Sequence, residues 1–167
     1  MFTRRLLGSV GVAGALLLAA IVVVKATGSN QTILEWRRLE LGDGRFKVEV
    51  VRTPAQLQRG LMGRPEMAAD QGMLFVLPGN QPIQFWMKST LIPLDMLWMD
   101  RNLGVIYIQE SAPPCTADPC PLYGPNQTAA YVLELNGGRA RQAHIQVGDR
   151  ASVSEMISAG DGPTGAP

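Results

Sequence analysis

The chain opens with a long hydrophobic run, and short alternating patterns follow it. Residues Leu6 to Val24 are nineteen uncharged positions, preceded by Arg4 and Arg5 and followed by Lys25. At ~1.5 Å per residue, a helix over this run would span roughly 28 Å, about the hydrocarbon thickness of a bilayer. The two leading arginines favour a cytoplasmic amino terminus. We therefore expect the chain after residue 25 to be extracytoplasmic.

Two fates stay open for this segment. Its glycines and alanines weaken it as a permanent anchor, and Val24-Lys25-Ala26 is an imperfect cleavage site. Residues 1–25 are therefore either a cleaved signal peptide or a retained anchor that crosses the membrane through residues 6–24. Both alternatives predict the periplasm or the cell surface, with the protein secreted or anchored by one amino-terminal segment.

Farther along, apolar positions follow the two-residue period of strands. Alternating residues on both sides of the turn Gly42-Asp43-Gly44 predict a β-hairpin. Turn residues separate five more segments of strand character, which are Met73–Leu77, Ile83–Lys88, Met96–Met99, Val105–Ile108 and Tyr131–Leu135.

Helical signals are few. Thr53-Pro54-Ala55-Gln56 combines a capping threonine, a first-turn proline and a capping-box glutamine, which predicts a short helix ending near Gly60. A second short helix is expected over Gly138–Ala143. Many strands and one or two short helices indicate a mainly β, α+β domain with a small, mostly antiparallel, barrel-like sheet.

Length and composition indicate one domain. Residues 26–32 are a polar connector, residues 33–157 form the folded domain, and residues 158–167 are a glycine- and proline-bearing tail expected to be disordered. We expect this domain to be a monomer. The whole chain carries a net charge of +1, and the part after residue 25 carries −2, which excludes an electrostatic nucleic-acid interface.

Motifs for common enzymes and cofactors are missing. His144 is the single histidine, and no glycine-flanked serine elbow occurs, which argues against a catalytic triad. No phosphate-binding glycine loop is present, and no cofactor is expected. The sequence contains two cysteines, Cys115 and Cys120, whose four intervening residues differ from redox or zinc spacing. Outside the cytoplasm they predict a disulfide, with a redox or metal dithiol as the alternative.

Five sequence motifs occur in a familiar order. They are Gly60-Leu61-Met62-Gly63-Arg64; Gly72-Met73-Leu74-Phe75; Phe85-Trp86-Met87-Lys88-Ser89-Thr90 followed by Pro93-Leu94-Asp95; Leu133-Glu134-Leu135-Asn136-Gly137-Gly138; and Gly148-Asp149. Over about residues 48–153 this arrangement resembles the family called domain of unknown function 192. The resemblance implies a compact β-rich domain, often exported, with no settled biochemical activity. The proline- and cysteine-bearing loop is longer here than many members need.

One strand suggests a binding surface. In Ile83–Lys88, Trp86 and Lys88 share a face, and the motifs place Arg64 and Thr90 near them. These four residues could form a shallow pocket for an anionic or aromatic ligand. The commoner alternative in proteins is structural, with Trp86 closing one end of the barrel and Lys88 paired with an acidic residue, Asp95 or Glu134.

Glu134 lies within the apolar segment Tyr131–Leu135. An unpaired buried charge costs several kcal/mol, so a partner is expected, and Arg64 and Lys88 are the candidates. A second hypothesis makes Asp95 and Glu134 the acid and base of an enzyme, which requires a suitable separation between them.

Six methionines within forty residues raise a third possibility, because thioethers can bind copper(I) outside the cytoplasm. Packing against aromatic residues in the core explains them better, and no metal site is expected. The six are Met62, Met67, Met73, Met87, Met96 and Met99.

The leading hypothesis is a non-enzymatic, extracytoplasmic module that binds a small ligand or an envelope protein. Its candidate site residues are Arg64, Trp86, Lys88 and Thr90, with Asp95 and Glu134 as the charged candidates near them.

Overall fold

The computed structural model describes residues 35–79 and 82–156. The expected signal peptide or anchor (residues 1–25), connector (26–32) and tail (158–167) lie outside these ranges. Within the ranges, neither helix has the length and apolar character needed to cross a bilayer.

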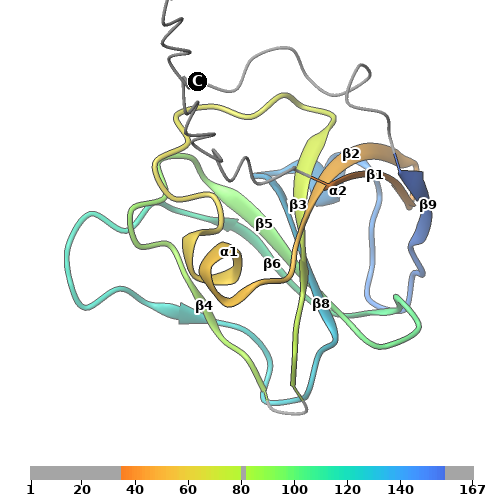
Figure 1. Cartoon of the computed structure of the whole chain (residues 1–167). Helices are drawn as coiled ribbons and strands as arrows, with labels where there is room; N and C mark the ends of the chain where they lie inside the picture. Colours follow the sequence, from red (N-terminus) through yellow and green to blue (C-terminus); the bar gives the residue numbers. More distant parts are fainter. Residues whose placement is uncertain (1–34, 80–81, 157–167) are drawn as a thin grey trace, which may run out of the picture. The chain divides into compact units, whose positions relative to one another are not determined.

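The described residues form one large sheet, one small sheet and two short helices (Figure 1). In chain order the elements are β1 (Glu35–Leu41), β2 (Gly44–Val51), α1 (Pro54–Arg59), β3 (Gln71–Val76), β4 (Phe85–Trp86), β5 (Leu94–Met99), β6 (Val105–Ala112), β7 (Leu122–Tyr123), β8 (Tyr131–Asn136), α2 (Arg139–Gln142) and β9 (Ser152–Met156).

The large sheet has seven strands in the order β6-β5-β8-β3-β2-β1-β9. Every neighbouring pair is antiparallel except β2 and β3, which run parallel because α1 lies in the connection between them. The sheet is therefore mixed. Its edge strands do not pair, but a bridge between Gly104 and Arg150 links the segments that enter β6 and β9. The mainly β, barrel-like prediction is confirmed.

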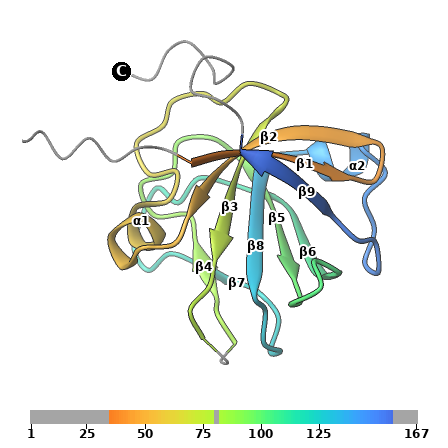
Figure 2. The same cartoon turned by 45° about the vertical axis from the view of Figure 1, so that its right-hand side comes forward.

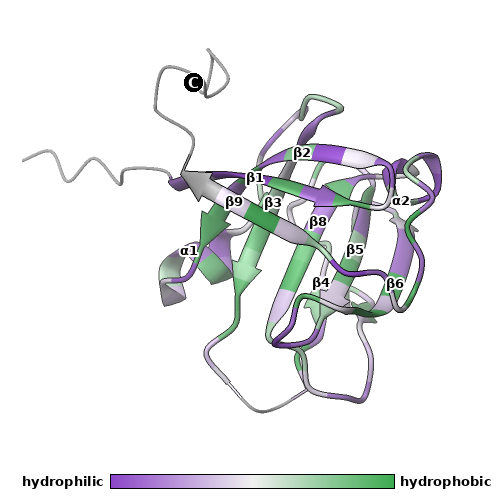
Figure 3. Ribbon diagram, turned by 90° about the vertical axis from the view of Figure 1, so that its right-hand side faces the viewer, coloured by the Kyte–Doolittle hydropathy of each residue, from purple (hydrophilic) through white to green (hydrophobic). Residues whose placement is uncertain are grey.

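The two helices cover opposite faces of the large sheet (Figure 2). One face packs with Ala140 of α2 against Leu97 and Leu133, and we call this cluster the α2 core. The other face packs with Leu57 of α1 against Met96 and other residues, and we call it the α1 core. Strands β3 and β8 are buried on both faces and are mainly hydrophobic in Figure 3, whereas β2 alternates only in its first half and is buried on both faces from Val48 to Val51.

Local signals predict the first helix well and the fourth strand poorly. Thr53 and Gln56 form the expected capping box at α1. The expected strand Ile83–Lys88 is regular only at Phe85–Trp86. Lys88 forms an isolated bridge with Cys115, and the chain turns at Ser89, which has a φ of 56°. This short strand pairs with β7, a strand that the sequence analysis missed, in a separate two-stranded sheet.

Candidate functional site

A cavity of about 300 Å³ opens over the α1 face of the sheet. It lies between the end of α1, the segment after β3, strand β4 and strand β8. Most of its lining is aliphatic or aromatic, with few polar side chains. The lining residues are Leu57, Gln58, Arg59, Gly60, Leu61, Met62, Phe75, Leu77, Pro78, Ile83, Gln84, Phe85, Trp86, Thr90 and Glu134.

Aromatic packing fixes one wall of this cavity. The rings of Phe75 and Phe85 meet edge to face with centroids 5.0 Å apart, and Phe85 meets Trp98 in the same way at 5.8 Å. The indole Nε1 of Trp98 donates to the carbonyl of Ile83 at 3.0 Å. Because Trp98 is fully buried, this wall is anchored in the core.

The first family motif forms the opposite wall. Gly60 follows α1 with a φ of 46°, and a Cβ there would lie 3.2 Å from Cζ of Phe75, so glycine permits both the turn and the close approach. The N–H of Gly63 donates to the carbonyl of Ser89 at 2.8 Å. This hydrogen bond joins the first motif to the segment that carries Thr90.

Glu134 supplies the single carboxyl group among the lining residues. It projects from β8 between Met73 and Met96, its directly opposite neighbours on β3 and β5, and only 5% of it is exposed. No residue in the described ranges hydrogen-bonds to its side chain. Burial raises the pKa of Glu134 from 4.5 to about 8, so the group is mostly a neutral acid at pH 7.

A second buried glutamate, Glu49, has an ion-pair partner. Glu49, Met73 and Glu134 lie side by side on β2, β3 and β8 and form one row across the sheet. Glu49 lies opposite Met73 on β2 and is also 5% exposed. Its Oε2 accepts a hydrogen bond from the Arg64 guanidinium at 2.8 Å. Arg64 therefore neutralises Glu49, and the expectation that it pairs with Glu134 is wrong. The sequence analysis missed Glu49, although a carboxylate inside the apolar run of β2 was the same signal that marked Glu134.

Asp95 lies on the other face of the sheet. It is opposite Leu135, whereas Glu134 is opposite Met96, so the two carboxyl groups point to opposite sides. The Asp95 carboxylate accepts three backbone hydrogen bonds at 2.7–2.9 Å, from the N–H groups of Ser111, Gly138 and Ala140. This group holds the start of α2 and a bulge of β6. The hypothesis of an acid–base pair with Glu134 is contradicted by this geometry.

Trp86 and Thr90 line the cavity, and Lys88 lies beside it. Trp86 is 47% exposed and does not close the end of a barrel. The Lys88 Nζ lies 5.7 Å from the centroid of the Trp86 ring and 2.9 Å from Oδ2 of Asp118. The expected pairing of Lys88 with Asp95 or Glu134 is therefore wrong. Three of the six predicted residues meet in the cavity, namely Trp86, Thr90 and Glu134.

The predicted disulfide is confirmed. Cys115 and Cys120 are bonded, with their sulfurs 2.12 Å apart. The N–H of Cys115 donates to the carbonyl of Met87 at 3.2 Å, and Asp118 inside the ring pairs with Lys88. The ring thus lies beside Met87 and Lys88, directly after the strand that carries Trp86. A disulfide of this kind fits an oxidising, extracytoplasmic compartment.

The methionines serve the core. Met73, Met87 and Met96 are buried in the α1 core, whereas Met99 is buried in the α2 core on the other face. Met62 lines the cavity. They pack as hydrophobic side chains on both sides of the sheet, and this distribution does not favour a copper site.

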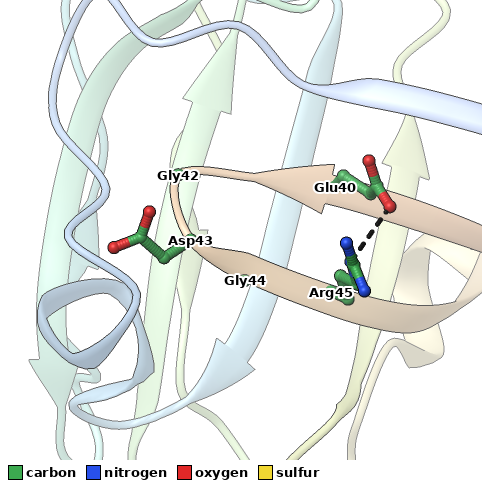
Figure 4. A pocket seen from close by; sticks show the side chains of 5 residues that line it. All are labelled: Glu40, Gly42, Asp43, Gly44 and Arg45. Carbon is green, nitrogen blue, oxygen red and sulfur yellow. Dashed lines mark ion pairs between the residues drawn. The ribbon is translucent and has the colours of Figure 1, made fainter.

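A second hollow lies at the tip of the β1–β2 hairpin (Figure 4). There Arg45 Nε lies 3.2 Å from a carboxylate oxygen of Glu40, and both side chains are largely exposed. The Asp43 side chain points away from this pair and lies 2.8 Å from Nδ1 of the exposed His144. Solvated ion pairs with no apolar wall make this hollow a poor ligand site.

Comparisons with known proteins agree with the motifs. One similar solved structure is the crystal structure of a protein from Sinorhizobium meliloti 1021, described as a candidate transcription regulator. Its sequence is 34% identical to this chain and the TM-score is 0.67, with an alignment that covers 72% of this chain and 95% of that protein. The crystal structure of a protein of unknown function from Novosphingobium aromaticivorans DSM 12444 is also similar. Its sequence is 29% identical and the TM-score is 0.66, with an alignment that covers 85% of this chain and 99% of that protein. No curated protein sequence matches. The model of domain of unknown function 192, described as an uncharacterized ACR, matches residues 37–153, and the chain belongs to this family.

Proposed function

We propose that the domain is an exported binding module that takes a small, largely apolar ligand in the cavity over Glu134. The observation that carries this proposal is the Glu134 carboxyl, which is buried at a cavity and has no protein partner in the described ranges. Its oxygens are not sealed, since Arg139 Nε is the one buried side-chain nitrogen or oxygen of the described residues without a partner, so the carboxyl opens into the cavity, where a ligand can reach it. The anchored aromatic wall gives that ligand a preformed surface.

Export is the second part of the proposal. The uncharged run of residues 6–24 behind Arg4 and Arg5 would carry the domain across the membrane, where the Cys115–Cys120 bond is stable. Fractionation of cells that express the full chain should place the domain outside the cytoplasm. Intact mass then distinguishes a cleaved signal peptide from a retained anchor. Recovery of the chain in the cytoplasm would contradict export.

The binding proposal is tested with two neighbouring exposed residues. Trp86 lines the cavity, whereas Leu122, directly opposite it on β7, does not and is 59% exposed. Saturation-transfer NMR of the full-length protein with a set of small apolar fragments should show saturable binding. The Trp86→Ala variant should lose this binding and Leu122→Ala should keep it.

The alternatives give different results. Equal loss of binding in both variants would indicate a flat protein-docking surface over Trp86 and Leu122 instead of a cavity. Absence of fragment binding to the unsubstituted protein would overturn the proposal.

A further inference from the structure

We propose that the cavity selects an organic cation, an ammonium group on an apolar or aromatic body, with Glu134 as its counter-ion. This inference rests on the proposed binding function and names the ligand's chemical class. It follows from three features, which are the charge inventory around Glu134, the walls of the cavity, and the acceptor capacity of its carboxyl group.

Among the described residues, no cation pairs with Glu134. Arg64, on the segment after α1, pairs with Glu49 at 2.8 Å, and Lys88, after β4, pairs with Asp118 at 2.9 Å. The neighbours of Glu134 on β3 and β5 are methionines, which do not titrate. Arg59 of α1 lines the cavity but is exposed to solvent. A cation that balances Glu134 would therefore come from a ligand.

The walls suit the body of such a ligand. Leu61, Phe75 and Phe85 give apolar surface to the cavity that Glu134 lines, and Trp86, which is 47% exposed, lines it as well. Aromatic faces attract ammonium groups and also pack against hydrocarbon. At about 300 Å³ the cavity is at the small end of ligand pockets, which favours one ring or a short chain.

The carboxyl group prefers a cation over other head groups. An ionised carboxylate accepts charge-assisted hydrogen bonds, which are roughly twice as strong as neutral ones. A ligand ammonium would stabilise the ionised form of Glu134, and the acid would release its proton to solvent as the complex forms. An anionic ligand would instead face either a like charge or a neutral acid, with compensation from the exposed Arg59 alone among the lining side chains.

Proton release makes the binding depend on pH. The pKa of Glu134 is about 8 without a ligand, and a simple primary amine stays protonated at this pH. Below pH 8 the ligand must displace the proton, so its apparent affinity should fall towards tenfold per pH unit. Of the other charged groups nearby, Glu49 pairs with Arg64 and Lys88 pairs with Asp118, whereas Arg59 lines the cavity from an exposed position.

The experiment compares three ligands of similar shape on the full-length protein. Isothermal titration calorimetry at pH 6, 7 and 8 would measure 2-phenylethylamine, 2-phenylethanol and 3-phenylpropionate. We expect the amine to bind at least tenfold more tightly than the alcohol at pH 8, with proton release visible as a buffer-dependent heat. This preference should disappear in Glu134→Gln and persist in Glu49→Gln, a control at an equally buried position of the same row.

The outcomes separate the inference from the function on which it rests. Equal affinity for amine and alcohol, or tighter binding of the carboxylate, would overturn the cation inference while leaving a ligand-binding cavity. Fragment binding without binding of the amine would overturn it as well. Failure of every fragment and all three ligands would overturn both proposals.

Discussion

Asp95 on β5 and Glu134 on β8 occupy adjacent strands of one sheet and are both almost completely buried, yet their surroundings differ in kind. The Asp95 carboxylate accepts three backbone N–H groups on the α2 face. The Glu134 carboxyl has no partner among the described residues on the α1 face and borders a cavity. Burial alone therefore does not mark a functional carboxyl group. The satisfaction of its hydrogen bonds distinguishes a structural role from an open site.

The two buried glutamates of the α1 face differ in the same way. Glu49 and Glu134 flank Met73 in one row, and within the described ranges Glu49 forms an ion pair whereas Glu134 forms none. The guanidinium of Arg64 lets Glu49 stay buried as part of an ion pair. Glu134 instead stays buried by keeping its proton.

The largest effect is expected for Asp95→Ala. The substitution leaves three backbone N–H groups without their acceptor, so the free energy of unfolding should fall by about 3–5 kcal/mol in urea titrations at pH 7. Asp149→Ala is the control, because Asp149 accepts one backbone N–H, from Gln146 at 2.8 Å, and should cost about 1 kcal/mol. Equal costs for the two variants would contradict the structural role of Asp95.

The second prediction concerns the pH dependence of Glu134. Its pKa is raised to about 8 in the folded protein and is 4.5 ordinarily, so the native state holds an extra proton between these values. The contribution of Glu134 to the free energy of unfolding is therefore greatest below about pH 4.5. It falls as the pH rises, by about 1.4 kcal/mol per pH unit up to about pH 8.

Substitution isolates that slope from the titration of other groups. Unfolding free energies of the unsubstituted protein and Glu134→Gln, measured at several pH values between 5 and 8, should converge at the acidic end. The unsubstituted protein should lose about 3 kcal/mol relative to the variant between pH 5 and pH 7. Parallel pH profiles would show that Glu134 is ionised at neutral pH and has a partner.

The third prediction turns Glu49 into a second unpaired acid. Arg64→Met removes its partner, and the free energy of unfolding should fall by about 2 kcal/mol in denaturant titrations. The expected cost is below that of Asp95→Ala because the Arg64 side chain is 29% exposed, and water can reach the carboxylate. The double variant Arg64→Met with Glu49→Met should recover most of the loss. Failure to recover would mean that Arg64 acts through packing.

The sequence predicted local structure from local signals. Alternating residues around Gly42-Asp43-Gly44 identified the β1–β2 hairpin, and Thr53 with Gln56 identified α1. These elements depend on contacts within a few residues. The parallel pairing of β2 with β3 depends on how the chain crosses over through α1, and no periodicity in a single strand reveals that.

The candidate site was predicted in part for the same reason. An acidic residue in an apolar strand marked Glu134, and the Trp86–Thr90 motif marked one side of the cavity. The partner of each charge was not predictable, because Arg64 reaches Glu49 across fifteen positions and Lys88 reaches Asp118 across thirty. Which carboxyl group stays unpaired is decided by these distant contacts, and it determines where the site lies.

The smallest effect is expected for Lys88→Met, which tests whether the rim of the cavity contributes to the fold. Lys88 and Asp118 have side chains 44% and 68% exposed, so their ion pair should contribute under about 1 kcal/mol, and the melting temperature should fall by less than about 4 °C. Lys47→Met is the control, because Lys47 forms a similarly exposed pair with Asp70 at 3.8 Å. A fall above ~8 °C for Lys88→Met alone would show that the rim is structural.

With the fold preserved, removal of the ammonium 5.7 Å from the Trp86 ring frees that aromatic face. The variant should therefore bind 2-phenylethylamine at least as tightly as the unsubstituted protein, and weaker binding would place Lys88 in the site itself.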